Sequence, residues 1–522
     1  MKEWKRNLKS LVRIIFGRTM VVVLGLALQV FFLVSALSFF YDNYVYFSIA
    51  SAVLSAIVIV WIINDNTNPY YKLAWIIPVT LIPVFGTILY VFVKMEWGTH
   101  VMNKRILKLI GETSPFIEQD EKTLEELSEI STREKNLAVY MRKYAGYPVW
   151  KNTYAEYYPL GEDAFESMIR ELENAKEFIF MEYFIVERGE MWDTILEILI
   201  RKAGEGVDVR FMYDGMCSLV LVPYSYPKKL IAQGVKCKMF SPIKPVLSTV
   251  QNNRDHRKIL VVDGHTAFTG GVNLADEYIN KCSRFGHWKD TAVMIKGEAV
   301  AGFTMMFLQN WNITEYGCED KYEKFIKTDF PEIAEKNLPT GGFVMPYGDS
   351  PLDNENVGQN VYLDILNRAE KYVHIMTPYL ILDNEMTSAL TYAAKRGVEV
   401  IIIMPHIPDK QYAYILARSY YKELISAGVK IYEYTPGFVH AKCFVSDGIR
   451  AVVGSINLDY RSLFLHFECA CYFYMNSVVR QVEDDVRKTL EKCVQITVED
   501  CKKYNVFKRI AGHILRIIAP LM

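Results

Sequence analysis

The sequence predicts an α/β protein in which two tandem α/β/α halves form one pseudo-twofold body, preceded by an α-helical membrane region. Three observations support this fold class. A stretch with His, Lys, Asp and Asn at matched spacing occurs twice, strand-like and helix-like runs alternate in the same order before each copy, and long apolar runs precede both. A chain of 522 residues is long enough to form two such halves.

Residues 1–100 are predicted to form the membrane region, with two or three apolar helices. The apolar runs are Thr19–Phe40, Tyr44–Ile63 and Leu73–Val93. Each approaches or exceeds the roughly 20 residues that an apolar helix needs to cross a bilayer. A cleaved signal peptide is the alternative for the first run, but its length and the two runs behind it favour an anchor. We therefore expect a multi-pass protein of the cell membrane.

Basic residues flank both ends of the apolar block, which bears on its orientation. Six precede it, and Lys94, Lys104, Arg105 and Lys108 follow it. The positive-inside rule then places both flanks in the cytoplasm and requires an even number of crossings. The third run carries Pro78, Pro83 and Gly86, so it is the candidate for a re-entrant segment. Nine cysteines without a CxxC pair also favour the cytoplasmic side for the body.

Residues 101–150 are charged and periodic and predict a helical linker. Residues 151–330 and 331–522 are the two predicted halves. The first has strands at Glu177–Val186 and Val207–Tyr213 around a helix, and the second repeats this order at Tyr372–Ile381 and Val398–Met404. Strand, helix and strand at this spacing indicate a parallel βαβ unit. The segment of about residues 321–359, rich in Pro, Gly, Asp and Asn, is the expected joint.

The repeated stretch carries the candidate functional residues. Its first copy has His256, Lys258, Asp263, Gly270-Gly271 and Asn273, and its second has His440, Lys442, Asp447, Gly454-Ser455 and Asn457. If residues 256–262 form one strand, His256 and Lys258 share a face and Asp263 falls on the other parity, where it would tether the turn. The second copy gives the same arrangement. An imidazole beside a permanent cation suggests a phosphate-bearing substrate.

Two facing copies can perform acid–base and nucleophilic chemistry on one phosphate. One imidazole attacks phosphorus while the other protonates the leaving alkoxide, and the lysines and amides stabilise the charge. This chemistry requires no metal or other cofactor, and we expect none. A single H-x-K-x4-D pattern is weak, but two copies with the same G-[GS]-x-N-L continuation are a strong indication.

At these residues the sequence resembles the phospholipase D superfamily, and with its apolar N-terminus it is similar to the bacterial cardiolipin synthases. The resemblance implies two-step phosphatidyl transfer through a phosphohistidine, joining two phosphatidylglycerols into cardiolipin and releasing glycerol. It implies His256 as the nucleophile and His440 as the acid and base. An acidic residue downstream commonly orients each histidine; Asp290 fits the first half and Glu468 the second. Asn273, Asn457 and Ser455 would contact the substrate.

Two positions depart from the pattern. Gly271 stands where the signature has Ser, so the first half lacks one hydroxyl donor. His466 stands where relatives often carry Asn, and we interpret it as a packed or exposed histidine without a role.

Several alternatives stay open at this point. A phospholipase D-type hydrolase, or a transferase that uses another alcohol, would share the motif. A nuclease is disfavoured because 59 basic residues are offset by 60 acidic ones, which predicts no nucleic-acid partner. An inactive membrane scaffold is disfavoured by both His-Lys pairs. The basic amphipathic stretch 506–522 either lies among lipid headgroups or packs on the body as a helix.

Overall fold

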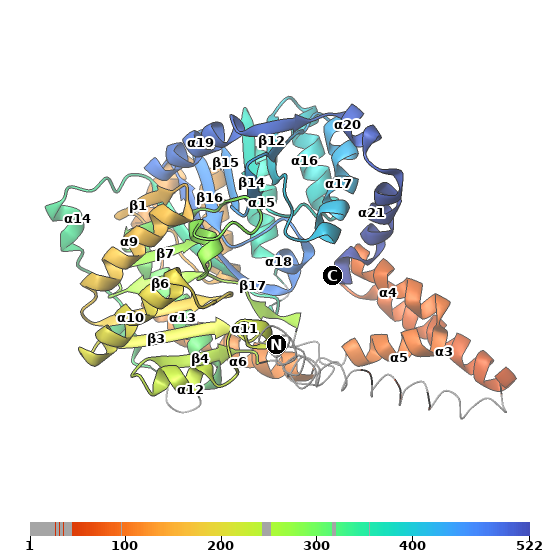
Figure 1. Cartoon of the computed structure of the whole chain (residues 1–522), viewed down its shortest axis with the longest axis horizontal. Coiled ribbons are helices and arrows are strands. Elements are labelled where there is room, and N and C mark those ends of the chain that lie inside the picture. Colours follow the sequence, from red (N-terminus) through yellow and green to blue (C-terminus); the bar gives the residue numbers. More distant parts are fainter. Residues whose placement is uncertain are drawn as a thin grey trace, which may run out of the picture.

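The computed structural model describes residues 44–94, 97–242, 252–315, 320–353 and 355–521, together with Ala27, Phe31 and Ser35. Three N-terminal helices project from the rest of the molecule (Figure 1). They are α3 (Tyr44–Asn64), α4 (Pro69–Leu81) and α5 (Pro83–Lys94). Of the helices in these ranges, none is at once long enough and apolar enough to span a membrane. The predicted run Thr19–Phe40 lies outside the described residues except at the three isolated positions.

The third apolar run is two helices and not one. The chain turns between α4 and α5 at Ile82, where Pro83 limits the preceding residue to extended conformations. The two helices then pack closely, since a Cβ at Gly86 would lie 2.3 Å from the carbonyl oxygen of Pro78. The result is a tight helical hairpin.

The linker is helical, as its periodicity predicts. It comprises α6 (Trp97–Thr113), α7 (Glu121–Ile130), α8 (Thr132–Tyr140) and a π-helical turn at Met141–Ala145. Asp120 and Ser131 cap α7 and α8 with their side chains. Glu134 of α8 is buried and accepts hydrogen bonds from Arg450 at 2.6 Å and Tyr472 at 2.8 Å. The linker is therefore fastened to the second half by a buried ion pair.

The first half is built on a seven-stranded mixed sheet with the order β1-β9-β7-β6-β2-β3-β4. Strands β2, β3 and β4 are parallel, as the βαβ pattern predicts, and the others are antiparallel. The strands are β1 (Thr153–Tyr158), β2 (Phe178–Tyr183), β3 (Asp208–Asp214), β4 (Lys236–Phe240), β6 (Ile259–Val262), β7 (Thr266–Gly270) and β9 (Ala292–Gly297). The helices are α9 (Gly161–Asn174), α10 (Glu190–Gly204), α11 (Cys217–Val220), α12 (Tyr226–Ile231) and α13 (Val300–Trp311).

The second half repeats this strand order. Its sheet runs β10-β17-β16-β15-β11-β12-β13, with β18 added at the edge. The strands are β10 (Phe343–Asp349), β11 (Tyr372–Met376), β12 (Glu399–Pro405), β13 (Lys430–Tyr434), β15 (Cys443–Ser446), β16 (Arg450–Gly454), β17 (His466–Tyr474) and β18 (Cys493–Ile496). The helices are α14 (Pro331–Glu335), α15 (Val357–Arg368), α16 (Asn384–Lys395), α17 (Gln411–Ser426), α18 (Tyr460–Phe464), α19 (Ser477–Leu490), α20 (Val498–Lys503) and α21 (Val506–Ile518). The segment 321–359, predicted to be a connection between the halves, therefore also contains a strand of the second sheet, β10.

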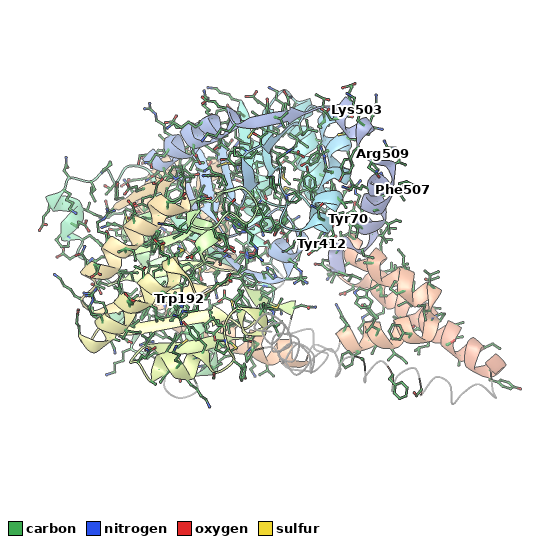
Figure 2. The ribbon with its side chains drawn as sticks, in the orientation of Figure 1. Tyr70, Trp192, Tyr412, Lys503, Phe507 and Arg509 are labelled. Carbon is green, nitrogen blue, oxygen red and sulfur yellow. The ribbon has the colours of Figure 1, made fainter. Side chains whose placement is uncertain are left out.

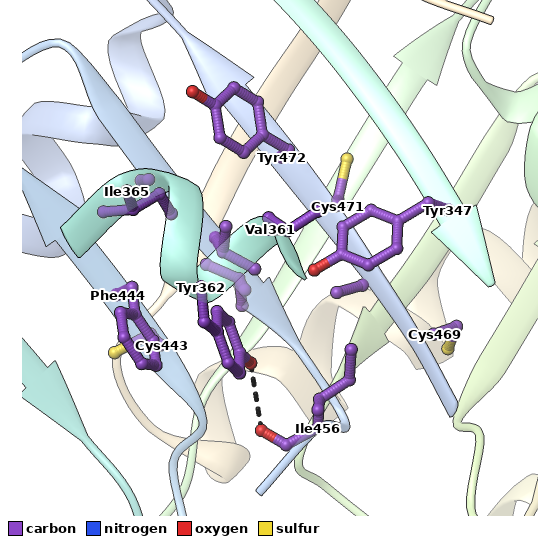
Figure 3. Packing of buried hydrophobic residues seen from close by; sticks show 14 of the residues in the cluster. Tyr347, Val361, Tyr362, Ile365, Cys443, Phe444, Ile456, Cys469, Cys471 and Tyr472 are labelled. Carbon is purple, nitrogen blue, oxygen red and sulfur yellow. Dashed lines mark hydrogen bonds between the residues drawn. The ribbon is translucent and has the colours of Figure 1, made fainter. Parts of the chain in front are cut away.

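The two halves exchange contacts along their boundary. Helix α13 of the first half packs on β10 of the second, and α19 of the second half packs on β1 of the first. Every residue of α13 is buried. In the core of the second half, Tyr362 stacks on Phe444 with centroids 4.0 Å apart and donates to the carbonyl of Ile456 at 3.0 Å (Figure 3). This bond fixes the turn that leads into Asn457.

The C-terminal helix α21 packs on α17 and also contacts α4. Gly512 allows the close approach to α17, because a Cβ there would lie 2.9 Å from the carbonyl oxygen of Ile415. Arg516 lies over the Tyr420 ring at 4.0 Å. Residues 506–518 thus form a helix that packs on the body with one face and exposes the opposite face.

Candidate active site

Each repeated motif is placed by a short strand that pairs with the other half. The sequence predicts one strand over 256–262, but the structure has β5 (Arg254–Asp255), a break at 256–258, and then β6. Strand β5 runs parallel to β17, with Phe467 opposite Asp255, and the His256 amide donates to the Phe467 carbonyl at 2.9 Å. The predicted strand is interrupted because β5 pairs with β17 of the second half, whereas β6 pairs with β2 and β7 of the first half.

This pairing places His256 beside Glu468. The Nδ1 atom of His256 lies 2.9 Å from Oε1 and 3.0 Å from Oε2 of that carboxylate. Glu468 is fully buried, and its Oε2 also accepts the hydroxyl hydrogen of Ser455. The carboxylate of the second half therefore holds the imidazole of the first.

The second motif is arranged in the same way with the halves exchanged. Strand β14 (Gly437–Val439) runs parallel to β8 (His287–Lys289), and the His440 amide donates to the Lys289 carbonyl at 2.7 Å. His440 Nδ1 then lies 2.6 Å from Oδ2 of the buried Asp290. The expectation that each acid orients the histidine of its own half is wrong, because each catalytic strand pairs across the boundary. Glu468 and Asp290 are nevertheless the two partners.

The short contacts to Glu468 and Asp290 favour the tautomer that carries its proton on Nδ1 in both imidazoles. Donation from Nδ1–H to a carboxylate leaves the Nε2 lone pair available on each ring. Burial and the adjacent Lys258 hold the pKa of His256 well below its usual value. Burial, with Lys442, lowers the pKa of His440 to about 4, although Asp290 opposes this shift. Both free imidazoles are therefore neutral at pH 7.

The two motif lysines lie beside their histidines, as predicted, although residues 256–258 and 440–442 do not form the strands on which that prediction rests. Lys258 Nζ donates to the His256 carbonyl at 2.5 Å, and Lys442 Nζ donates to the His440 carbonyl and lies 2.8 Å from His440 Nδ1. Burial lowers the pKa of Lys258 to about 8 and that of Lys442 to about 7. An incoming phosphate anion would stabilise both ammonium groups.

The carboxylates of the motif aspartates accept hydrogen bonds from backbone amides at the start of a neighbouring strand. Asp263 accepts hydrogen bonds from the amides of Lys176, Glu177 and Phe178 at 2.7–2.8 Å. Asp447 accepts the equivalent bonds from Glu370, Lys371 and Tyr372 at 2.8–3.0 Å. Both residues have positive φ, of 52° and 55°. The prediction that they tether the strand ends is confirmed, and neither carboxylate contacts a histidine.

The motif asparagines also have protein partners. Asn273 accepts from the Ile185 amide at 3.0 Å and donates to the Tyr278 hydroxyl at 2.9 Å. Asn457 donates to the Ser462 hydroxyl at 3.0 Å, while its Oδ1 is buried without a hydrogen-bond partner. In this structure, then, the amides hold the loops beside the histidines.

The Ser455 hydroxyl, predicted to contact substrate, is hydrogen-bonded to the Glu468 carboxylate in this structure. It donates to Glu468, and it accepts from the Cys469 amide at 3.0 Å. At the corresponding position in the first half, a Cβ on Gly271 would lie 2.1 Å from Asp290 Oδ1. The missing Ser side chain thus leaves room for the shorter acid to approach His440.

Sequence reasoning missed His466 as a site residue. Its ring centroid lies 5.5 Å from that of His256, and its Nδ1 lies 3.7 Å from Glu468 Oε1. Strand parity could have found it, since residues 466 and 468 share a face of β17. Phe184 also packs edge-on against His256 at 4.9 Å. The sequence offered no spacing rule for that contact.

One cluster of possible metal ligands lies at the site, although the proposed chemistry is expected to need no metal. Within the described ranges, one group has donor atoms close enough to hold an ion. It consists of His256, His466 and Glu468, whose donor atoms lie within 4.8 Å of one another.

Comparison with known proteins identifies the family. Residues 168–311 and 362–490 match the family described as "Cardiolipin synthase, PLD-like domain", and residues 53–94 match "Phospholipase_D-nuclease N-terminal". An uncharacterized protein of Streptococcus mutans is 47% identical over 89% of this chain and 99% of its own length. A cardiolipin synthase of Halalkalibacterium halodurans is 32% identical over 91% of this chain and 94% of its own. Cardiolipin synthase 2 of Bacillus anthracis is 33% identical over 88% of each chain.

A solved structure shares the fold. The crystal structure of phosphatidylserine synthase from Haemophilus influenzae matches with a TM-score of 0.56 at 15% identity, covering 74% of this chain and 98% of that one. The matched domains contain both His–carboxylate pairs, and the relatives match over nearly their whole length. The chain belongs to the cardiolipin synthase family of the phospholipase D superfamily and is a phosphatidyltransferase of that superfamily.

Proposed function

We propose that this enzyme is a cardiolipin synthase that transfers a phosphatidyl group between two phosphatidylglycerol molecules, releasing glycerol. The observation that carries the proposal is the pair of buried imidazoles, each held at Nδ1 by a carboxylate of the opposite half at 2.6–3.0 Å. Two imidazoles with free Nε2 atoms and two lysines provide a nucleophile, an acid and an anion-binding site. The similarity to cardiolipin synthases supports the choice of lipid.

In the first step, His256 Nε2 attacks phosphorus and the bond to the glycerol oxygen breaks. His440, protonated at Nε2, gives its proton to that oxygen, so that glycerol leaves as a neutral alcohol. The anionic phosphodiester raises the pKa of the imidazoles beside it and so allows His440 to carry this proton. Lys258 and Lys442 offset the charge on the non-bridging oxygens. Glu468 stabilises the positive charge of the phosphorylated His256 ring.

In the second step, a hydroxyl of another phosphatidylglycerol gives its proton to His440 Nε2 and attacks phosphorus. The bond to His256 breaks, cardiolipin is released and both imidazoles return to their starting state. The proton that His440 takes from the acceptor alcohol replaces the one that it gave to glycerol, so the cycle neither gains nor loses protons. Assignment of His256 as the nucleophile rests on family resemblance together with the two-oxygen contact from Glu468.

We also propose the division of labour along the chain. Residues 1–100 hold the enzyme in the cell membrane with more than one crossing, and residues 101–150 connect this region to the body. Residues 151–330 and 331–522 supply one motif each, on the cytoplasmic side. Similarity to cardiolipin synthases and to the N-terminal family at residues 53–94 supports a membrane location.

Product analysis tests the proposal. Purified full-length enzyme incubated with phosphatidylglycerol alone should form cardiolipin and glycerol in equal amounts, measured by mass spectrometry. Phosphatidic acid without cardiolipin would instead identify a hydrolase. Cardiolipin-like products that appear only after addition of another alcohol would identify a different acceptor. Cleavage of DNA without lipid turnover would indicate a nuclease. Product formation that is undiminished in His256→Ala would mean that the motifs are not its source and would favour a scaffold with a relic site.

Trapping of the intermediate tests the order of the two histidines. With phosphatidylglycerol labelled at phosphorus, the His440→Ala variant should carry label on His256, formed slowly and retained, because both formation and breakdown of the intermediate have lost their acid–base residue. The His256→Ala variant should accumulate none. Label found on His440 in the latter variant would reverse the assignment.

A further inference from the structure

Glu468 lies between two imidazoles, and only one of them is needed by the proposed reaction. His256 Nδ1 is 2.9 Å from Oε1 on one side, and His466 Nδ1 is 3.7 Å from the same oxygen on the other. His466 has an exposed fraction of only 9%, and both of its ring nitrogens are buried without a hydrogen-bond partner. A buried, unsatisfied imidazole is costly unless something binds it.

The three donors suit a borderline-soft divalent cation. Two imidazoles and one carboxylate form the His₂Glu set that binds zinc in catalytic sites with an open fourth position. Ligand atoms around a tetrahedral zinc ion lie about 3.4 Å apart, given bonds of about 2.1 Å. The donor atoms here all lie within 4.8 Å of one another, and the two imidazole contacts with Glu468 Oε1, at 2.9 and 3.7 Å, bracket the spacing of ligand atoms around zinc. The His440–Asp290 pair belongs to no comparable group among the described residues.

We propose that His256, His466 and Glu468 bind a divalent transition-metal ion such as Zn²⁺, and that this ion inhibits the enzyme. A neutral imidazole carries one ring proton, which Glu468 keeps on Nδ1 of His256. Coordination of the metal at Nδ1 moves that proton to Nε2, the atom proposed to attack phosphorus, and so removes its lone pair. The ion also neutralises the carboxylate that stabilises the phosphorylated ring.

The surroundings limit how tightly the ion is held. Lys258 Nζ donates to the His256 carbonyl at 2.5 Å, and its positive charge beside this imidazole repels a cation. The bound ion is therefore exchangeable, unlike one in a closed structural site, and a chelator should remove it. The metal need not displace phosphatidylglycerol to inhibit, because coordination at Nδ1 removes the Nε2 lone pair of the same ring.

Zinc binding and inhibition can be measured on the full-length enzyme in detergent after treatment with EDTA. Binding is read from competition with a chromophoric chelator, which counts the zinc ions held per chain. Activity is read as phosphatidylglycerol turnover, relative to each variant's own metal-free rate. The wild type should bind one zinc ion more than His466→Asn, and inhibition of His466→Asn should require at least about tenfold more zinc. Added EDTA should restore the wild-type rate.

His406→Asn is the matched control. His406 Nδ1 lies 3.0 Å from Glu433 Oε2, and its side chain is 49% exposed. Among the residues that the structure describes, this pair belongs to no group of three donors. This variant should behave as the wild type. Equal zinc stoichiometry and equal inhibition in the wild type and His466→Asn would overturn the proposal, as would binding without inhibition. If His466→Asn does not fold, judged by circular dichroism, His466→Gln replaces it.

The inhibitory part of this inference rests on the proposed role of His256, but the binding part does not. A lack of cardiolipin formation with retained zinc binding at His466 would refute the proposed function alone. Unaffected cardiolipin formation with no difference in zinc binding would refute the metal site alone.

Discussion

Glu468 has more of the site's interactions than any other side chain described above. Both of its oxygens face His256 Nδ1, its Oε2 accepts from Ser455, and His466 approaches its Oε1. In the proposed mechanism, its charge selects the His256 tautomer and stabilises the phosphorylated ring. A substitution that removes the charge of Glu468 but keeps its shape distinguishes this electrostatic role from a role in packing.

The Glu468→Gln variant should lose about 10²- to 10⁴-fold in kcat, since the amide can favour the wrong tautomer and cannot offset the ring charge. Turnover of phosphatidylglycerol measures the loss. The matched control is Glu483→Gln, which alters a buried His–Glu contact of 2.9 Å at His374, outside the site. A similar loss in both variants would mean that the effect is structural.

The two motif lysines predict the basic side of the pH profile. Burial places the pKa of Lys442 at about 7 and that of Lys258 at about 8, both lowered from the usual lysine value. As pH rises through these values, each group loses the positive charge that holds the phosphate. The kcat/KM value, which reports the free enzyme, should therefore fall between pH 7 and 9. A value that stays constant in this range, with an unchanged circular dichroism spectrum, would contradict the assignment.

At the scale of elements, the connection from β7 to β8 sets the position of Asp290. Gly271 follows β7, and its lack of a side chain admits the Asp290 carboxylate. The corresponding segment of the second half uses Ser455 with the longer Glu468. The two halves thus reach short His–carboxylate contacts, of 2.9 Å at Glu468 and 2.6 Å at Asp290, with different pairs of residues.

The Gly271→Ala variant tests this arrangement. The new Cβ would lie 2.1 Å from Asp290 Oδ1 and 2.9 Å from the His440 carbonyl, so the carboxylate must move away from His440. We expect a loss of about 1–3 kcal/mol in stability from overpacking, and turnover should fall well beyond what that loss explains. The control Gly204→Ala, with no atom within 4 Å of its Cβ, should keep both properties. Equal turnover in the two variants would show that Asp290 tolerates the displacement.

The sequence predicted the elements of the site better than their pairing. Spacing within one chain segment is local information, so it correctly placed each Lys beside its His and each Asp at a turn. Which carboxylate meets which histidine depends on β5 and β14, which are two and three residues long and pair with the opposite half. No periodicity reveals a strand so short. The position of His466 follows from a different signal: it shares a face of β17 with Glu468, two residues along the strand.

At the scale of the whole molecule, the exposed apolar side chains gather on the N-terminal helices and on α21. Helix α3 exposes Ile49, Val53, Ile57 and Val60 at 56–61%. Helix α21 exposes Phe507 at 81%, and Figure 2 shows Phe507 and Arg509 on its outer side. Because α21 contacts α4, the two apolar surfaces are adjacent. Such a surface on a phosphatidyltransferase fits a lipid bilayer.

The composition of α21 indicates the kind of lipid surface that it would meet. Residues 506–522 contain Lys508, Arg509 and Arg516 and no acidic residue. Its exposed apolar residues recur at helical spacing on one face. They are Val506, Phe507, Ile510, Ile514, Ile517 and Ile518. A basic helix with one apolar face lies in the headgroup region and prefers anionic lipids. Phosphatidylglycerol, the proposed substrate, is such a lipid, so α21 would lie among the substrate molecules.

Amide hydrogen exchange on the full-length chain in nanodiscs tests this orientation. Amides of α21 should exchange more slowly in discs with anionic lipid than in zwitterionic discs, since the helix is buried only in the former. Amides of α16, which shows no such apolar basic face, should exchange equally in both. A Phe507→Ser, Ile510→Ser variant should lose the difference and form cardiolipin more slowly from vesicles, but not from short-chain phosphatidylglycerol in micelles, where no bilayer surface must be reached. If α21 exchanges equally in both kinds of disc, its apolar face is covered by protein and the membrane contact is confined to the N-terminal region.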